Sequence, residues 1–278
     1  MKTKYTIEDM DRIADEIRSR IAIKPEIGLI LGSGLGQLSE SIQDPTVIPY
    51  HDLPGWPLST VEGHAGELVI GKLEGKDVLV MNGRIHFYEG YEMSQVTLPI
   101  RVMQRLGIEI VIVTNAAGGI NQDFTPGNPM VITDHLNLLG MAGPNPLRGP
   151  NLEEFGTRFP DMSQAYDRKL VDLTRKVAKE LDITLHEGIY VCLAGPTFET
   201  PADLRFLLNA GVDAVGMSTV PEVIVANHGG QRVLGISGIT NKSFLYGEGE
   251  TTHVEVMETG KILAPKMMEL IKGVLRSL

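Results

Sequence analysis

The chain has 278 residues, of which 42% are hydrophobic and 22% charged, as is typical of a folded globular protein. Its formal net charge of -10 argues against non-specific binding to nucleic acid or to a membrane surface, since both require a basic face. We therefore expect neither partner. No stretch has the layout of a signal peptide, and none reaches the roughly 18 apolar residues of a membrane span. The sequence thus predicts a cytoplasmic protein.

Three further kinds of chemistry lack support in the sequence. The single cysteine, Cys192, excludes an intramolecular disulfide, and its apolar neighbours predict a buried strand residue, with a reactive thiol as the alternative. The seven histidines are scattered and no aspartate cluster occurs, so we expect no metal site. No Gly-x-Ser-x-Gly motif marks a nucleophilic serine. If the protein is an enzyme, we therefore expect its nucleophile to be a bound substrate.

Helical and extended patterns alternate along the chain. The predicted elements, in order, are a helix over 7–17, a strand over 27–31, a hairpin of strands 67–73 and 77–82, a helix over 93–106, strand 108–114, helix 170–181, strand 188–194, a helix from 201, strand 213–217, helix 221–228, strand 232–240 and a C-terminal helix. Pro99 predicts a kink or a displaced turn in the helix over 93–106. Thr200 and Pro201 have the residue types of an N-cap and a first helical position.

This alternation predicts a single layered α/β domain over residues 1–278, with a central mixed sheet flanked by helices. Glycine-rich turns are expected after two of the strands, at 32–36 and at 115–119. Ligands of such folds bind at the carboxyl ends of the strands. That rule brings a set of residues to one rim: Ser33, Asn115, Ala116, Phe198, Glu199, Ser218 and Asn241.

The turn at 32–36 is a candidate anion site. Its spacing lacks the third glycine of a dinucleotide-binding fingerprint, and no Gly-Lys-Ser/Thr follows as in a P-loop. The backbone amides and the Ser33 hydroxyl could still donate to an anion, although a plain tight turn explains the glycines equally well.

A second anion-binding pattern lies at 84–88. In an extended segment, Arg84, His86 and Tyr88 point to the same side, and the guanidinium suits bidentate contact with phosphate. A solvated strand edge is the alternative. His64, between glycines, is either a gate over the site or an ordinary loop histidine.

Seven motifs, in the same order along the chain, resemble those of the low-molecular-mass, homotrimeric purine nucleoside phosphorylases, within the family that also holds methylthioadenosine phosphorylases. They are Gly32-Ser33-Gly34-Leu35-Gly36, residues 83–90, 114–119 and 145–150, Ala194–Thr200, Gly216–Glu222 and Ile239–Lys242. The resemblance implies the phosphorylase/hydrolase-like fold and phosphorolysis of inosine, guanosine and their 2'-deoxy forms in purine salvage. It implies inorganic phosphate as a co-substrate, with no cofactor and no metal.

The resemblance also implies the site residues. Those for phosphate are Ser33, His64, Arg84, His86, the Ala116 amide and Ser218. Those for the purine are Phe198, Glu199, Val215, Gly216 and Asn241. Those for ribose are Tyr88, Met217, His253 and Phe159, the last supplied by the neighbouring subunit of a homotrimer. The residues implied to be catalytic are His86, Glu199 and Asn241. The loop before His253 is the stretch least like the family.

Elementary chemistry agrees with these roles. Glycosidic cleavage passes through an oxocarbenium-like state, which a fixed anion beneath the sugar both stabilises and attacks. The leaving purine gains negative charge, and the Asn241 amide is a neutral donor suited to its N7. The Glu199 carboxylate can accept from N1-H, and Phe198 can pack on the ring.

Three other functions are alternatives to purine nucleoside phosphorolysis. A methylthioadenosine phosphorylase shares the phosphate site, but Glu199, Asn241 and a polar His253 argue against it. A non-catalytic nucleoside-binding protein has no need of the phosphate residues Ser33, Arg84, His86 and Ser218. A nucleoside hydrolase would hold calcium with an aspartate cluster that is absent from the sequence.

Overall fold

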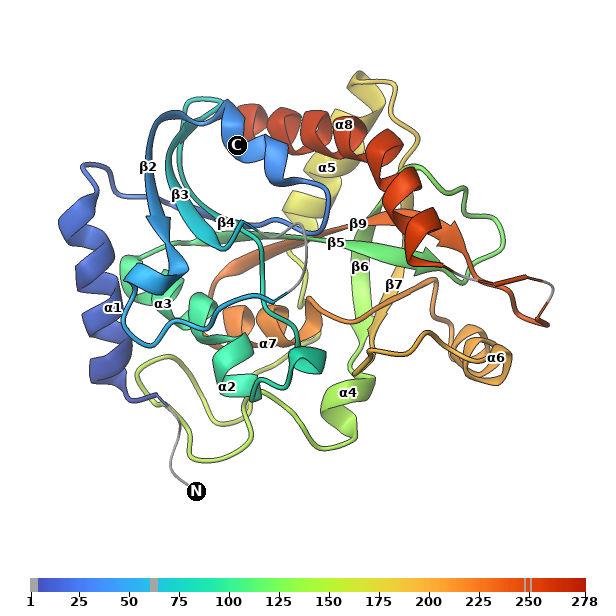
Figure 1. Ribbon diagram of the computed structural model, residues 1–278, viewed down its shortest axis with the longest axis horizontal. Coiled ribbons are helices and arrows are strands. Elements are labelled where there is room, and N and C mark those ends of the chain that lie inside the picture. Colours follow the sequence, from blue (N-terminus) through green and yellow to red (C-terminus); the bar gives the residue numbers. More distant parts are fainter. Residues whose placement is uncertain (1–4, 61–64, 248, 251) are drawn as a thin grey trace.

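A computed structural model describes residues 5–60, 65–247, 249–250 and 252–278 (Figure 1). Its nine strands are β1 (Ile27–Ile30), β2 (Gln43–Pro49), β3 (Glu67–Leu73), β4 (Lys76–Asn82), β5 (Ile110–Gly119), β6 (Asn128–Leu136), β7 (His186–Cys192), β8 (Ala214–Gly216) and β9 (Arg232–Lys242). The helices are α1 (Ile7–Arg20), α2 (Met93–Val96), α3 (Leu98–Leu106), α4 (Leu138–Met141), α5 (Arg168–Glu180), α6 (Pro201–Asn209), α7 (Val220–His228) and α8 (His253–Ser277), with short 3-10 turns at Gly36–Ser41, Tyr50–Asp52 and Phe87–Glu89. The predicted layered α/β fold with a mixed central sheet is confirmed.

The strands form one sheet in the order β2-β3-β4-β1-β5-β8-β7-β6-β9. Because β9 also pairs with β5 in parallel, the second half of the sheet closes into a ring of five strands. Parallel and antiparallel pairs are mixed: β1 is parallel to both β4 and β5, whereas β5 is antiparallel to β8. Closure removes the free edges of these strands.

Helices cover the sheet on both sides. In Figure 1, α5 and α8 lie above the long strands β5 and β9, and α2, α3 and α7 lie below them. Helix α1 packs against α3. Within the part of the chain that the structure describes, no helix combines the length and apolarity needed to cross a membrane.

Local sequence signals account for several helix boundaries. The Thr6 hydroxyl accepts from the Asp9 amide and the Asp9 carboxylate accepts from the Thr6 amide, which caps α1. Thr200 and Asp203 repeat this arrangement at α6, as predicted. The break expected at Pro99 is also present, because α2 ends before Thr97 and Pro99 occupies the first turn of α3.

Two predictions of local structure were wrong, and two strands were not predicted. The turn expected at 115–119 is the second half of β5, because small residues there let β9 pair along its whole length. The strands that were not predicted are β2, an edge strand whose Pro45 lies at an irregularity in its register with β3, and β6, which pairs with β7 and β9. The segment 84–88 is not fully extended, because a 3-10 turn begins at Phe87.

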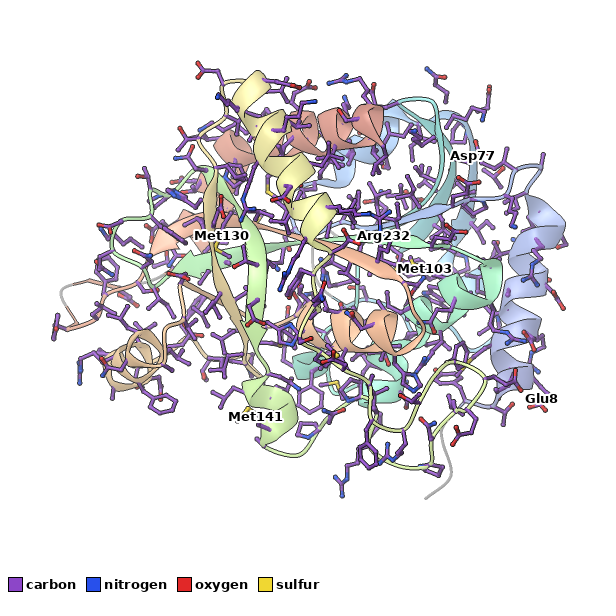
Figure 2. All side chains as sticks on the ribbon, turned by 180° about the vertical axis from the view of Figure 1, so that it is seen from behind. Glu8, Asp77, Met103, Met130, Met141 and Arg232 are labelled. Carbon is purple, nitrogen blue, oxygen red and sulfur yellow. The ribbon has the colours of Figure 1, made fainter. Side chains whose placement is uncertain are left out.

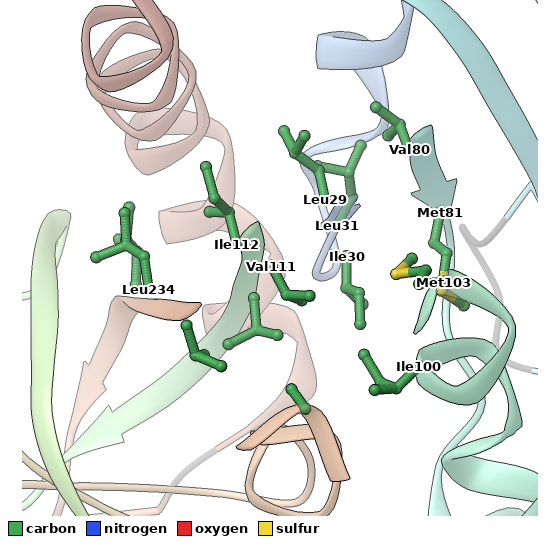
Figure 3. Packing of buried hydrophobic residues seen from close by; sticks show 14 of the residues in the cluster. Leu29, Ile30, Leu31, Val80, Met81, Ile100, Met103, Val111, Ile112 and Leu234 are labelled. Atoms are coloured by element: carbon green, nitrogen blue, oxygen red, sulfur yellow. The ribbon is translucent and has the colours of Figure 1, made fainter. Parts of the chain in front are cut away.

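The core lies between the sheet and its helices. Figure 3 shows Leu29 and Leu31 on the side of the sheet where Val80 lies, and Ile30 on the opposite side, toward Ile100 and Met103 of α3, all nearly inaccessible to solvent. Figure 2 shows from behind how Met130 lies within the fold while Met141, on α4, projects at its margin. Cys192 ends β7 and is buried, as predicted, and burial raises the pKa of its thiol. A buried neutral thiol is unreactive, so the alternative of a reactive Cys192 finds no support.

Candidate active site

A cavity of about 700 Å³ opens at the rim of the sheet where β1, β5, β8 and β9 carry polar residues. It contains almost all of the predicted site residues. They are Ser33, Arg84, His86, Tyr88, Ala116, Phe198, Glu199, Val215, Gly216, Met217, Ser218 and Asn241. The structure therefore brings together residues separated by more than two hundred positions in the sequence. Among the described residues, no group of three histidine, cysteine or acidic side chains could hold a metal ion.

The turn after β1 places Ser33 against β5. The Gly32 amide donates to Thr114 Oγ1 at 2.9 Å, and Thr114 in turn donates to the carbonyl of Ile30 at 2.9 Å. A Cβ atom on Gly32 would lie only 2.8 Å from the Asn115 Cα, so this close approach requires glycine. The first glycine of the motif thus positions Ser33 beside the polar residues of β5.

Arg84 is buried, with 2% of its surface exposed, yet it lines the cavity. Its guanidinium donates to the Thr114 carbonyl, to Thr219 Oγ1 at 3.3 Å, and to Glu222 Oε1 at 3.4 Å in a buried ion pair. These acceptors hold the planar cation from the protein side. The alternative of a solvated strand edge is excluded for Arg84, because its side chain is inside the protein.

After Arg84, His86 is the N-cap residue of a 3-10 turn and Tyr88 lies within that turn. Their rings stack with centroids 4.8 Å apart, so the two side chains share a side although the segment is not extended. Glu89 Oε1 accepts from the His86 amide at 2.6 Å and lies 3.1 Å from His86 Nδ1. Although burial by itself raises the pKa of Glu89, hydrogen bonds from His86 and Thr60 outweigh it and lower the pKa to about 2. The ionised carboxylate therefore fixes the imidazole.

Phe198 and Glu199 precede α6, and Asn241 comes from β9. Burial raises the pKa of Glu199 above its ordinary value, which places the carboxyl group in a partly desolvated part of the cavity. Asn241 is 5% exposed, and its Oδ1 lies 3.1 Å from Thr240 Oγ1, whose one hydrogen is also within reach of the Ala117 carbonyl at 3.3 Å. The Asn241 side chain lines the cavity, and its amide nitrogen is a group that can donate into it.

Of the three other predicted residues, Phe159 does not line the cavity, and the side chains of the other two are not described. Phe159 is 87% exposed, and its ring lies under Arg158, with the guanidinium carbon 5.7 Å from the ring centroid. His64 lies outside the described residues. His253 is the first residue of α8, and its side chain also lies outside the description.

Sequence reasoning missed the residues that support Arg84. Thr219 and Glu222 are buried behind the cavity at the start of α7, and Thr114 lies beside them on β5. Thr219 and Glu222 belong to the motif 216–222 that carried the resemblance, but their contact with Arg84 joins positions 135 and 138 residues apart. No local pattern reports such a contact.

Comparison with known proteins agrees with this geometry. The sequence model of the phosphorylase superfamily matches residues 26–276, nearly the whole chain. The chain therefore belongs to the phosphorylase superfamily. Within it, the relatives are purine nucleoside phosphorylases, and this protein is a member of that group by sequence and by fold.

The similarity to these relatives extends over their full length. The chain is 53% identical over 265 residues to purine nucleoside phosphorylase 1 of Bacillus subtilis, covering 95% of this chain and 97% of the relative. The Schistosoma mansoni purine nucleoside phosphorylase, solved in complex with inosine, superposes with a TM-score of 0.94 at 44% identity, covering 98% of this chain and 97% of that one. A structure of the Schistosoma mansoni enzyme in complex with adenosine gives the same TM-score and identity, with 98% of each chain covered.

Proposed function

We propose that the protein catalyses the phosphorolysis of purine nucleosides, with inosine and guanosine as preferred substrates. A phosphate oxygen forms a bond to C1' of the ribose, the C1'–N9 bond breaks, and the bonding pair leaves with the purine, which takes up a proton. The products are a free base and ribose 1-phosphate. The observation that carries this proposal is that one cavity holds both a cluster of anion-binding groups and a pair of purine-binding groups.

The phosphate site is assigned to Ser33, Arg84, His86, the Ala116 amide and Ser218. The position of the Arg84 guanidinium supports this assignment. The Arg84 guanidinium faces the cavity while Glu222 and Thr219 hold it from behind, so its charge is preorganised. Donors fixed in this way stabilise charge in the transition state without reorganising during the reaction. In this proposal the bound anion is the nucleophile.

The base site is assigned to Phe198, Glu199 and Asn241, with Val215 and Gly216 beside them. A Glu199 carboxylate accepts from the N1-H of a 6-oxopurine, and the Asn241 amide nitrogen donates toward its O6/N7 edge. Proton donation or hydrogen bonding at N7 relieves the charge that the leaving base accumulates. Tyr88 and Met217 complete the ribose side of the cavity.

We also propose a homotrimer in which Phe159 completes the ribose site of the neighbouring subunit. A phenyl ring that is 87% exposed in the single chain supports this, because an exposed aromatic side chain near a polar rim is typical of an interface. Head-to-tail contacts of this kind close into a ring.

Phosphate dependence is the decisive test. Release of hypoxanthine from inosine should require phosphate, and ribose 1-phosphate should form in equal amount. Arg84→Ala should lower turnover at subsaturating phosphate by about 10²-fold or more, the order expected for a lost preorganised charge contact. Arg175→Ala, which removes an exposed arginine paired with Glu187, is the matched control and should leave turnover unchanged. Equal base release in phosphate-free buffer would refute the proposal.

A further inference from the structure

We infer that Thr219 is a positioning residue that fixes the direction of hydrogen bonding at the phosphate site. Its hydroxyl compels Ser218 to be a donor toward the bound anion, and it gives Arg84 and Asn115 a shared acceptor. This inference rests on the proposed phosphate site. It assigns a role to a residue that lies behind the cavity and is not among the residues lining it.

The backbone at Thr219 is the first observation. Its φ is +77° and its ψ is -54°, and the Val220 amide donates to the Ser218 carbonyl at 2.9 Å. These values describe a γ-turn of the rare, strained form, which disfavours a β-branched residue. Such strain persists only where the surroundings over-determine it, and it concentrates at functional sites. A glycine would occupy this conformation without strain, so the threonine is retained for its side chain.

The hydrogen bonds of Thr219 are the second observation. Thr219 is fully buried, and its Oγ1 accepts from Asn115 Nδ2 at 2.8 Å and from Arg84 Nη1 at 3.3 Å. A hydroxyl group has two acceptor lone pairs and one hydrogen. With both lone pairs engaged by nitrogen donors, the hydroxyl hydrogen of Thr219 has to be donated.

Ser218 Oγ receives that hydrogen. It lies 3.2 Å from Thr219 Oγ1, on a half-buried residue that lines the cavity. Because Thr219 donates to Ser218, the hydrogen of Ser218 is not needed for this contact and is available to another acceptor. The buried Tyr190 hydroxyl beside Ser218 is one such acceptor on the protein side. In the cavity we assign that role to an oxygen of the phosphate, because the reverse polarity would turn a serine lone pair toward the anion.

Three substitutions separate this role from a structural one. Thr219→Val keeps the branched shape and the strain but removes the hydroxyl. Thr219→Gly removes both the hydroxyl and the strain, since glycine accepts a positive φ. Thr219→Ser keeps the hydroxyl. The KM for phosphate, the kcat, and the affinity for inosine measured without phosphate are compared for each variant.

We expect Thr219→Val and Thr219→Gly each to raise the KM for phosphate by about 10-fold to 100-fold, the range for a lost hydrogen bond among charged groups. Thr219→Ser should stay within about threefold of wild type, and inosine affinity should change by less than about twofold in all three variants, since the base site is not involved. In a Ser218→Ala background the effect of Thr219→Val should shrink, because part of it acts through Ser218.

The outcomes are distinct. A wild-type enzyme that needs no phosphate overturns the proposed function itself. A wild-type enzyme that needs phosphate, with an unchanged phosphate KM in Thr219→Gly, overturns the role of Thr219 alone. If Thr219→Val fails to fold, the glycine variant still decides the question. Full additivity of Thr219→Val with Ser218→Ala would refute the link through Ser218.

Discussion

Discrimination between 6-oxopurines and 6-aminopurines should depend on Glu199 and Asn241. Hypoxanthine presents N1-H as a donor and O6 as an acceptor, whereas adenine presents a bare N1 and a donating amino group. In the proposed base site the Asn241 amide nitrogen is the donor, while Asn241 Oδ1 lies 3.1 Å from Thr240 Oγ1. With adenine, therefore, a carboxylate faces a lone pair and an amide donor faces an amino donor.

The expected loss of kcat/KM for adenosine relative to inosine follows from these two mismatches. Asn241 is 5% exposed, and burial raises the pKa of Glu199, so neither group is well solvated. An unpaired buried polar group costs about 1–3 kcal/mol, and a charged one more. Together they should reduce kcat/KM for adenosine relative to inosine by about 10⁴-fold, as in other sites built to pair with a specific polar edge.

Asn241→Asp should narrow this ratio by about 10²-fold, because a carboxylate accepts from the 6-amino group and, when protonated, still donates to N7. The ratio should not reach unity, since Glu199 still faces the bare N1 of adenine. The assay is kcat/KM for inosine and adenosine at saturating phosphate. A relative crystallises with adenosine, so turnover and not occupancy is the quantity to compare.

Asn128→Asp is the matched control for this experiment. Asn128 Oδ1 accepts from Lys266 Nζ at 2.8 Å, outside the cavity, and a carboxylate preserves that contact. The control should leave the ratio unchanged. Wild-type values for the two nucleosides within about tenfold of each other, against the ratio that unpaired polar groups impose, would refute this assignment of the base site.

Three further predictions concern assembly and pH. If Phe159 serves the neighbouring subunit, Phe159→Ala and Arg84→Ala subunits should each be poorly active alone and regain activity when co-assembled; a fully active monomer in light scattering would contradict this. Because burial raises the pKa of Glu199, calorimetric affinity for hypoxanthine should fall with decreasing pH from a higher pH than an ordinary glutamate would set, and Glu199→Gln should lack that pH dependence. Glu89→Gln should lower the free energy of unfolding at pH 7 by about 2 kcal/mol. Since the pKa of Glu89 is lowered to about 2 from 4.5, its stabilisation is present above pH 4.5 and lost as pH falls toward 2, so urea unfolding of the two proteins should converge in acid; a difference independent of pH would contradict this.

Local signals were strong enough to predict most of the elements. The amphipathic spacing of α1, the apolar runs of β1, β3 and β4, and the caps of α1 and α6 depend on neighbours within a few residues. The motifs placed Ser33, Phe198, Ser218 and Asn241 at strand ends or just beyond, and the cavity contains all four. Such features follow from sequence because their physical causes are local.

Other features depend on contacts that no window of sequence contains. The short, mixed segments of β2 and β6 become strands through their pairing with β3, β7 and β9. The glycine-rich half of β5 is a strand because β9 runs beside it and closes the ring.

In the candidate active site, too, some features can be predicted from the sequence and others depend on tertiary contacts. The motif predicts that Arg84 binds an anion, but the burial of Arg84 and its contacts with Thr219 and Glu222 arise only when α7 packs behind β5. The strained turn at Thr219 is likewise invisible in sequence, since a β-branched residue disfavours a positive φ and only the surrounding hydrogen bonds stabilise it. The sequence by itself determined the chemistry of the groups that we propose meet the substrate, because residue type fixes it. The tertiary structure alone decided how those groups are oriented, because orientation depends on contacts between segments far apart in the chain.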